Sequence, residues 1–381
     1  MLTNTKSFIF YLIDSICLFL FKLYKQPVQY NTAIVKLDHI GDFFLAIDSI
    51  YSIYKREDKC VLICSKDLIG IAECCNFIDN IFPIDVAKYS GNILYRVQIN
   101  RKLSNFELQR AFHLSFSRVF LIGDSVSRFL NCKNKVAFVG DNSNQNNIQK
   151  RISSQWYWNL IPADSDNIFE GCLNNNFYKS VYGDSIIDPD IKLFENVKTP
   201  PLINEDYIVI NLGSSSANKR WNIHKFAELG SEVCQKYGYK IILTGSKNEK
   251  GLAAQFLDII VDVQKIDNMC GRTSIGEYIN LISNAKFVVT NDTSAAHIAP
   301  FFNIPCFVVY GGWHFGRFLP YSDDFRKIPP TVIYKKMDCF GCNISCYAKK
   351  DDLLSNFPCI SSLSVKEVSS VINNTLVSNN E

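Results

Sequence analysis

The sequence lacks the charge imbalance and low complexity that mark several common classes of protein. Its 381 residues contain 40 Lys and Arg against 37 Asp and Glu, so the net charge is only +3. Proteins that bind nucleic acid by neutralising phosphates usually carry a larger basic excess, so we expect no nucleic-acid partner. A hydrophobic fraction of 47% and a charged fraction of 20% exclude a disordered tail, a collagen-like chain and a coiled coil.

Two further absences narrow the function and the location. No G-x-G-x-x-G follows a predicted strand, which argues against an NAD-dependent oxidoreductase. There is no cleavable secretory signal, because Asp14 interrupts the N-terminal apolar run and no small-residue cleavage site follows it. We therefore expect a cytoplasmic protein whose fourteen cysteines are mostly reduced thiols.

The longest apolar run, residues 8–24, is too short and too polar to be a convincing membrane span. It has about 17 residues, the lower limit for crossing a bilayer. A carboxylate at mid-bilayer, here Asp14, costs roughly 2.5–3.5 kcal/mol. Lys22 and Lys25 follow at its end. We predict a helix that lies in the membrane interface or caps the first domain, and the alternative is a helix packed wholly on that domain.

From residue 31 onward, short apolar runs alternate with helical patterns, and this alternation begins again near residue 207. The length also favours two domains. The Pro-containing stretch between the two series shows no periodicity and is the expected linker. The predicted organisation is an N-terminal apolar helix (1–30), a first Rossmann-like domain (31–190), a linker (191–206), a second Rossmann-like domain (207–345) and a C-terminal segment (346–381).

Strand–helix alternation predicts an α/β fold with two doubly wound parallel sheets. In the first half we predict strands at 33–37, 61–64, 81–84 and 136–139 and a helix at 42–54. In the second half we predict strands at 207–211, 240–244, 287–290 and 305–310 and helices at 223–237, 249–260 and 274–284. Such sheets bind ligands beyond the carboxyl ends of their strands, so we expect one substrate for each half, meeting at a cleft.

The first polar cluster, residues 36–42 (KLDHIGD), stands where the first predicted strand turns into a helix. Gly41 permits a close backbone approach, and Asp42 falls near the helix N-terminus. Asp42 alone would be read as a helix cap. With Asp38 and His39 within five residues, the cluster favours a site.

The second cluster, residues 213–221 (GSSSANKRW), follows the strand that opens the second half. Ser214 and its small neighbours leave backbone N–H groups available, and Lys219 and Arg220 add two cations, a combination that suits a phosphate. The loop lacks the Gly-Lys-Ser/Thr order of a P-loop. The alternative is a surface loop with a solvated Lys-Arg pair.

The third cluster, residues 290–297 (TNDTSAAH), leads from a strand into a helical stretch. The first helical turn would present N–H groups to an anion near Asp292. The alternative is that Asp292 or Thr293 caps the helix and His297 packs in the core. Gly311 and Gly312, after the next strand, offer a second place where backbone can approach a ligand.

The C-terminal cysteines have the spacing Cys339-x2-Cys342-x3-Cys346-x12-Cys359. Four thiolates can hold a structural zinc, and the first pair has the spacing of a zinc knuckle. No second C-x2-C and no histidine accompany them, so free thiols in a packed segment are the preferred prediction, and we expect no metal.

Taken together, these clusters resemble glycosyltransferase family 9, the heptosyltransferase-like enzymes of bacterial surface-glycan synthesis. The matching segments are AIVKLDHIGD, YIVINLGSSSANKRW, GSKNE, CGRTSIGEYINLISNAKFVVTNDTSAAHIA and the C-terminal cysteine pattern. Their order covers roughly residues 31–368. The resemblance implies a GT-B fold and an inverting, metal-independent transfer. It places the nucleotide-sugar donor on the C-terminal half and the acceptor on the N-terminal half.

The resemblance also implies roles for individual residues. Asp42 matches the family's catalytic aspartate, Lys219 the cation at the donor phosphates, and Glu249 the acid that hydrogen-bonds the ribose. Ser294 stands where the family usually has glycine, which narrows the space beside the donor. With the loops described above, the expected donor-binding residues are Ser214, Lys219, Glu249, Asp292, Thr293, Ser294, His297, Gly311 and Gly312.

These roles agree with the chemistry of sugar transfer. An acceptor hydroxyl needs a base, and a departing nucleoside diphosphate needs cations and N–H donors. The expected partners are a nucleotide-sugar donor, a lipopolysaccharide or other lipid-linked acceptor, and the inner face of the inner membrane, with no cofactor. Heptose is the best-known donor sugar of the family. The alternatives are a nucleotide-sugar epimerase of the same architecture and a non-catalytic, membrane-associated binding protein.

Overall fold

The computed structural model divides into two compact units, unit 1 (Met1–Leu193) and unit 2 (Phe194–Glu381). It describes residues 2–21, 26–163, 169–189, 191–194, 197, 200–260, 265–322, 324–343, 345–346 and 356–378. Lys22, Lys25, and parts of the expected linker and C-terminal segment lie outside these residues. The division between the units falls inside the range 191–206 that the sequence marks as a linker.

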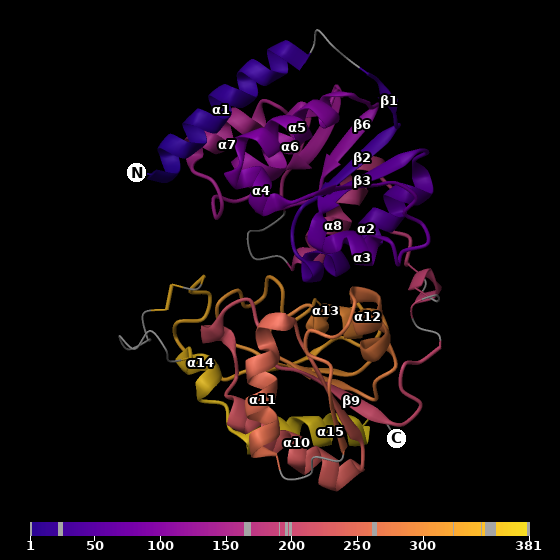
Figure 1. Cartoon of the computed structure of the whole chain (residues 1–381), viewed down its shortest axis with the longest axis vertical. Helices are drawn as coiled ribbons and strands as arrows, with labels where there is room; N and C mark the ends of the chain where they lie inside the picture. The colour runs from indigo at the N-terminus through magenta and orange to yellow at the C-terminus, as the bar shows by residue number, and fades with distance from the viewer. Residues whose placement is uncertain are drawn as a thin grey trace. The chain divides into compact units, whose positions relative to one another are not determined.

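The elements of unit 1 follow the predicted strand–helix alternation (Figure 1). Its strands are β1 (Val28–Gln29), β2 (Thr32–Lys36), β3 (Cys60–Ser65), β4 (Ile81–Ile84), β5 (Phe106–Glu107), β6 (Arg110–His113), β7 (Asn134–Phe138) and β8 (Asn159–Ile161). Its helices are α1 (Leu2–Phe21), α2 (Ile40–Arg56), α3 (Ile69–Ala72), α4 (Val86–Gly91), α5 (Ile93–Ser104), α6 (Ser125–Phe129), α7 (Asn147–Ser154) and α8 (Glu170–Tyr182).

The main sheet of unit 1 is parallel and has the strand order β4-β3-β2-β6-β7-β8. This is the doubly wound order, in which the chain starts in the middle, builds one half of the sheet and then crosses to the other half. Helices α5 and α6 lie on one side of the sheet, and α2 packs against α8 on the other (Figure 1). The order reverses between β2 and β6, which makes the carboxyl ends of these two strands the expected ligand site.

Unit 2 repeats the same plan. Its strands are β9 (Tyr207–Asn211), β10 (Lys240–Thr244), β11 (Ile266–Asn268), β12 (Val288–Thr290), β13 (Cys306–Val309) and β14 (Thr331–Ile333). Its helices are α10 (Ile223–Tyr237), α11 (Lys250–Ile259), α12 (Ile275–Ser283), α13 (Ala295–Phe301), α14 (Pro358–Ser361) and α15 (Val365–Ser378). The parallel sheet has the order β11-β10-β9-β12-β13-β14, so its reversal lies between β9 and β12.

The fold class predicted from the sequence is therefore confirmed, and the predicted strands and helices agree with the structure to within about two residues. The sequence did not predict β6, β8, β11 and β14 of the two main sheets. Each of these strands has only three or four residues, and β6 and β8 begin with polar side chains. A run of that length carries too little hydrophobic pattern to be distinguished from a loop.

Local signals explain where the longer helices begin and end. The Asn222 side chain accepts a hydrogen bond from the His224 N–H at the start of α10, and Gly238, with φ 71°, ends it. Ser274 and Glu277 form a reciprocal capping box at the start of α12. Such caps satisfy N–H groups that have no partner inside the helix, and glycine adopts a left-handed conformation without the usual steric penalty.

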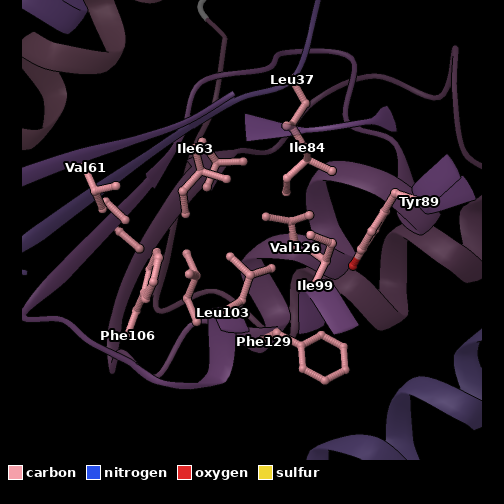
Figure 2. Close-up of a cluster of buried hydrophobic side chains, with 14 of the residues drawn as sticks. Leu37, Val61, Ile63, Ile84, Tyr89, Ile99, Leu103, Phe106, Val126 and Phe129 are labelled. Carbon is pink, nitrogen blue, oxygen red and sulfur yellow. The ribbon is translucent and has the colours of Figure 1, made fainter. Parts of the chain in front are cut away.

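The core of unit 1 is a cluster of aliphatic and aromatic side chains between the sheet and α5 and α6 (Figure 2). Figure 2 labels Leu37, Val61, Ile63, Ile84, Tyr89, Ile99, Leu103, Phe106, Val126 and Phe129. Cys17 from α1 also belongs to this cluster. The N-terminal helix is therefore packed on the first domain.

The N-terminal helix does not have the properties of a membrane span. Among the residues that the structure describes, no helix is both long and apolar enough to cross a bilayer. Asp14, which argued against a span in the sequence, is buried in α1 with only 2% of its surface exposed.

Candidate functional site

The first candidate site lies at the carboxyl ends of β2 and β6, where the strand order of unit 1 reverses. The connections on the two sides of a reversal leave the sheet over opposite faces, which opens a crevice at that position. The segment after β2 carries Asp38, His39 and Asp42, and the segment after β6 carries Ser115, whose hydroxyl bonds Asp38. The structure therefore brings the first sequence cluster together with a strand that the sequence did not predict.

A buried lysine fixes the position and the charge of Asp38. Lys36 Nζ donates to the Leu114 carbonyl oxygen at 2.7 Å and lies 2.8 Å from Asp38 Oδ2. The Ser115 hydroxyl donates to the same carboxylate oxygen at 2.6 Å. Burial opposes the charge on Lys36 and on Asp38, but their mutual attraction outweighs it, raising the pKa of Lys36 and lowering the pKa of Asp38. Asp38 is therefore a fixed anion.

The surroundings of Asp42 shift its pKa in the opposite direction from that of Asp38. The N-cap residue of α2 is His39 and not Asp42, whose carboxylate accepts a hydrogen bond from the His39 backbone N–H at 3.1 Å from the third helical position and so completes a capping box. Burial and then the charge of Asp38 raise the pKa of Asp42, although Lys36 and His39 act against them. A carboxylate with a raised pKa holds a transferred proton better than an ordinary one. The capping role and a role as a base are therefore compatible.

A second polar network, which the sequence did not reveal, lies beneath the end of β6. The Tyr157 hydroxyl donates to Asp124 at 2.7 Å and lies 2.8 Å from His113 Nδ1, and Arg118 donates to Asp124 at 3.0 Å. Burial opposes the charge of Asp124, but hydrogen bonding to His113 and the charge of Arg118 lower its pKa to about 2. At Gly123 a Cβ would lie 2.3 Å from the His113 ring, so glycine is required there. This network holds β6 in place beside Asp38.

The second candidate site lies at the carboxyl ends of β9 and β12, the reversal of unit 2. Asn291 connects the loops that follow these strands. Its amide nitrogen donates to the carbonyl oxygens of Leu212 and Gly213, both at 3.1 Å, and its oxygen accepts from the Trp221 N–H at 2.8 Å. The second and third sequence clusters therefore form one site, and Asn291 is a positioning residue that the sequence did not single out.

Lys219 is the buried cation of this site. Only 5% of its surface is exposed, and its Nζ lies 3.6 Å from Asp292 Oδ2 and 4.9 Å from the centre of the Trp313 ring. The Trp313 indole N–H donates to the same Asp292 oxygen at 2.8 Å. The alternative of a solvated lysine is therefore wrong. The sequence did not predict that Trp313 belongs to this site, because Trp313 reaches it from the loop after β13, far along the chain from Lys219.

Glu249 and Arg220 form the other side of the site. Glu249 Oε2 accepts hydrogen bonds from the backbone N–H and hydroxyl of Ser246, at 2.8 and 2.5 Å, and Oε1 lies 3.7 Å from Arg220. Ser214 Oγ and Arg220 Nε are enclosed but have no hydrogen-bond partner among the described residues. Enclosed polar atoms without partners are costly, so this is a place where a polar ligand would be stabilised.

In the segment after β12, the side chains of Thr293, Ser294 and His297 all have partners within the protein. The Thr293 hydroxyl lies 2.8 Å from the Thr290 hydroxyl and accepts from the Ala295 N–H at 3.3 Å. Ser294 precedes α13, and its side chain is hydrogen-bonded to buried Tyr278. His297 is buried, and its Nδ1 lies 2.9 Å from the Tyr321 hydroxyl. The structure thus supplies protein partners for all three, and their contact with a donor stays a prediction.

The lowered pKa of buried His297 predicts how the stability of the protein depends on pH. Burial lowers its pKa from 6.5 to about 4, and nearby Arg326 adds to this effect while Asp292 opposes it. The unfolded chain binds the proton of this histidine more tightly than the folded chain does. The contribution of His297 to the free energy of unfolding is therefore fully present above pH 6.5 and is lost as the pH falls toward 4. We expect a loss of about 3 kcal/mol from this group between pH 7 and pH 4. Urea denaturation at both pH values checks this.

The matched variant for that measurement is His297→Gln, which can still bond Tyr321 but cannot take up the proton. Between pH 7 and pH 4, this variant should lose about 3 kcal/mol less stability than the natural chain does. An NMR titration in which the His297 ring becomes protonated near pH 6.5 would contradict the assignment.

Gly311 and Gly312 have a packing role that the sequence did not predict. A Cβ at Gly311 would lie 2.1 Å from the Trp313 ring, and one at Gly312 would lie 2.3 Å from the Phe340 ring. The space beside both glycines is therefore filled by aromatic rings of the same unit. These rings explain why both positions are glycine without invoking a ligand, and direct contact between their backbone and a ligand stays a prediction.

The C-terminal cysteines lie within electrostatic reach of one another. Burial raises the pKa of Cys359, and the thiols of Cys339, Cys346 and Cys342 raise it further. In the described part of the chain, no group of three or more His, Cys, Asp or Glu side chains has a geometry that could hold a metal ion. Free thiols in this segment stay the preferred prediction.

Comparison with known proteins supports the family resemblance. The profile of "Glycosyltransferase family 9 (heptosyltransferase)" matches residues 176–347. Lipopolysaccharide heptosyltransferase 2 of Escherichia coli K12 is 31% identical over 114 residues, which are 29% of this chain and 30% of that protein. Lipooligosaccharide heptosyltransferase 2 of Campylobacter jejuni serotype O:6 is 21% identical over 308 residues, 80% of this chain and 87% of that protein.

The match to the E. coli protein and to two similar heptosyltransferases spans only 27–30% of their length. Among solved structures, E. coli heptosyltransferase WaaC with ADP-2-deoxy-2-fluoro heptose is similar in fold, with a TM-score of 0.69 and 14% sequence identity. That likeness covers 91% of this chain and all of the WaaC chain. The family profile, the Campylobacter jejuni relative and the shared two-domain fold agree with the motif order of the sequence, and residues 176–347 of the chain match glycosyltransferase family 9.

Proposed function

We propose that this chain is an inverting glycosyltransferase that moves a sugar from a nucleoside-diphosphate donor to a surface-glycan acceptor. One observation carries the proposal: the reversal of each sheet bears a site, and the two sites have complementary chemistry. Unit 1 presents Asp42 beside the fixed anion Asp38, and unit 2 presents Lys219 and Arg220. A base for a hydroxyl and cations for a diphosphate are the two requirements of sugar transfer.

In the proposed reaction Asp42 accepts the proton of the attacking acceptor hydroxyl. The hydroxyl oxygen forms a bond to the anomeric carbon, and the bond from that carbon to the donor phosphate breaks. The electron pair leaves with the nucleoside diphosphate, whose charge increases as it departs. Lys219, held between Asp292 and Trp313, is the buried cation that we assign to this charge.

Other groups of unit 2 complete the proposed donor site. The unpartnered Ser214 hydroxyl and Arg220 Nε are available to phosphate oxygens. Glu249 is held by Ser246, which orients its carboxylate for hydrogen bonding to the ribose, as the family resemblance implies. The proposal requires no metal ion, because side chains of the chain itself supply the positive charge.

We further propose ADP-heptose as the donor and a lipopolysaccharide core as the acceptor. The support is the family profile, the heptosyltransferase relatives and the ADP-heptose analogue named with WaaC. A lipid-linked acceptor implies work at a membrane surface, for which we propose the cytoplasmic face of the inner membrane. Calorimetry with a panel of nucleotide sugars, followed by a transfer assay with acceptor, tests these assignments. Release of free sugar without an acceptor would favour an epimerase instead.

Replacing Lys219 is expected to weaken donor binding. The Lys219→Ala variant removes a charge-assisted contact to the diphosphate, so the binding free energy should fall by roughly 1.5–3 kcal/mol. Calorimetry with ADP-heptose measures this loss. Lys236→Ala in α10 is the matched control, because it removes an exposed lysine of the same unit. Unchanged affinity in the Lys219 variant, with folding intact, would remove Lys219 from the donor site.

A further inference from the structure

Helix α1 has one face fixed to unit 1 and one face that is apolar and exposed. The exposed positions include Phe8, Ile16 and Phe19, with 61%, 60% and 71% of their surfaces accessible. Ile9, Leu12 and Leu20 share this face and are also exposed. At 100° per residue, these six positions fall within one continuous stripe along the helix. We call this set of six residues the outer stripe.

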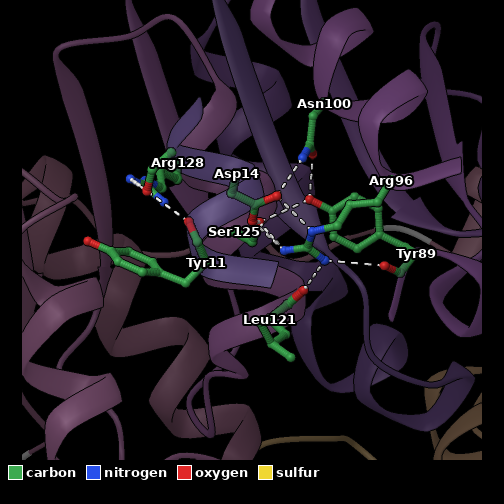
Figure 3. Close-up of polar contacts among 9 residues, drawn as sticks. Tyr11, Asp14, Tyr89, Arg96, Asn100, Leu121, Ser125 and Arg128 are labelled. Atoms are coloured by element: carbon green, nitrogen blue, oxygen red, sulfur yellow. Dashed lines mark hydrogen bonds and ion pairs between the residues drawn. The ribbon is translucent and has the colours of Figure 1, made fainter. Parts of the chain in front are cut away.

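A buried ion pair fixes the direction in which the outer stripe points (Figure 3). On the opposite face of α1, Asp14 receives hydrogen bonds from Arg96 Nε at 2.8 Å and Nη2 at 2.5 Å. Asn100 and Ser125 donate to the same carboxylate at 3.0 and 2.8 Å. Arg96 is fully buried and also bonds the carbonyl oxygens of Tyr89 and Leu121. The helix therefore cannot roll to bury its stripe without breaking this network.

Cations stand beside both ends of α1. Lys6 is exposed in its N-terminal part and lies over the Phe10 ring. At the other end, Leu18 and Phe21 line a cavity of about 790 Å³ together with Arg128 and Lys133. Arg128 also contacts the middle of the helix, where it is held between the rings of Tyr11 and Trp156 and its Nη2 donates to the Ser15 hydroxyl at 3.0 Å. These cations favour an anionic partner for the apolar surface.

We propose that the outer stripe of α1 is a docking surface for an anionic lipid bilayer, with the helix lying in the interface. A helix with a large apolar face and flanking cations binds such an interface by burying that face at the level of the headgroups and acyl chains. The buried Asp14 network keeps the helix on unit 1, so it docks and does not insert across the bilayer. Membrane docking itself does not depend on the proposed function. Only its purpose does, which is to bring the chain to a lipid-linked acceptor.

A second copy of the chain fits this surface less well. If two α1 helices paired in parallel, Lys6 of one copy would face Lys6 of the other. If they paired antiparallel, Lys6 would face the end beside Lys133. Both arrangements place like charges together, whereas anionic headgroups complement all of these cations.

Vesicle binding of the full chain tests the proposal directly. The probes are vesicles of phosphatidylglycerol mixed with phosphatidylethanolamine, and vesicles of phosphatidylcholine alone. We expect binding to the anionic vesicles that weakens at high salt. We expect the Ile16→Ser/Phe19→Ser variant to lose roughly tenfold or more of this binding. The matched control is Leu202→Ser/Val377→Ser, which removes two exposed apolar side chains from unit 2 and should bind normally.

Circular dichroism and ADP-heptose binding are measured on the same variants, because both are independent of lipid. Loss of vesicle binding with both of these intact supports the docking surface. Equal vesicle binding by the α1 variant and the natural chain would overturn it, and so would an absence of vesicle binding in the natural chain. A dimer that depends on the stripe, without vesicle binding, would assign the surface to a second copy. Failure of donor binding in all variants would count against the proposed function and not against the surface.

Discussion

Replacing Asp42 with asparagine is expected to lower the rate of sugar transfer by about 10²–10⁴-fold. The amide cannot hold the proton of the acceptor hydroxyl, and a positioned base contributes a factor of this size. The fold should survive, because an amide oxygen can still accept the His39 N–H that the carboxylate accepts at 3.1 Å. Turnover with ADP-heptose and a lipopolysaccharide-core acceptor is the measurement.

Donor affinity in the same variant separates a base from a binding residue. It should change little, because every residue that we assign to the donor lies in unit 2. Asp58→Asn is the matched control, since Asp58 is exposed and lies before the amino end of β3, whereas Asp42 follows the carboxyl end of β2. Near-normal turnover of a folded Asp42→Asn protein would falsify the assignment and would leave Asp38 or His39 as the next candidate.

The contrast between Asp38 and Asp42 shows how far the sequence could assign this site. The motif placed both carboxylates after β2, because strand, turn and helix signals are local. It could not distinguish their roles, because these depend on groups that are distant in the chain. Ser115, 77 residues away, bonds Asp38 and lies in the segment after β6. Since β6 has only four residues and begins with Arg110, it could not be predicted from the sequence pattern.

The same limit applies to unit 2. The sequence identified Lys219 as a cation in a loop that suits phosphate binding. Its burial and its contacts, however, depend on Asp292 and Trp313, which follow other strands. The glycine pair after β13 was predicted to allow ligand approach, and the sequence could not show that the rings of Trp313 and Phe340 lie where a Cβ would be at these positions. Residue types and turns could be predicted locally, whereas the packing that determines their roles depends on the strand order.

The two sites occupy the same structural position in the two units and differ in their balance of acidic and basic groups. In unit 1 three carboxylates, Asp38, Asp42 and Glu170, act on the buried ammonium of Lys36. In unit 2 the cations Lys219 and Arg220 lie near one carboxylate each, at 3.6 and 3.7 Å. An excess of carboxylates favours taking up a proton, and loosely paired cations favour an incoming diphosphate. The repeated fold thus provides both halves of the proposed reaction.

Removing the carboxylate of Asp14 is expected to destabilise unit 1 by about 3–5 kcal/mol. In Asp14→Ala the Arg96 guanidinium stays buried but loses two of its hydrogen-bonded contacts. An uncompensated charge in the interior costs more than a lost surface interaction, because no water replaces the missing partner. Hydrogen exchange of amides in α5 measures the loss locally, and amides of α10 in unit 2 should be unaffected.

Two further variants identify the cause of that loss. Asp184→Ala removes the partner of Arg56 in an exposed pair, in which the Asp184 side chain is 52% accessible, and it should cost less than about 1 kcal/mol. The double variant Asp14→Leu/Arg96→Leu removes both buried charges and should be more stable than Asp14→Ala, although it retains no ion pair. If the double variant were the less stable protein, the hydrogen bonds from Arg96 to Tyr89 and Leu121 would outweigh the charge pair. α1 would then be held by shape and backbone bonding, and its orientation would not depend on Asp14.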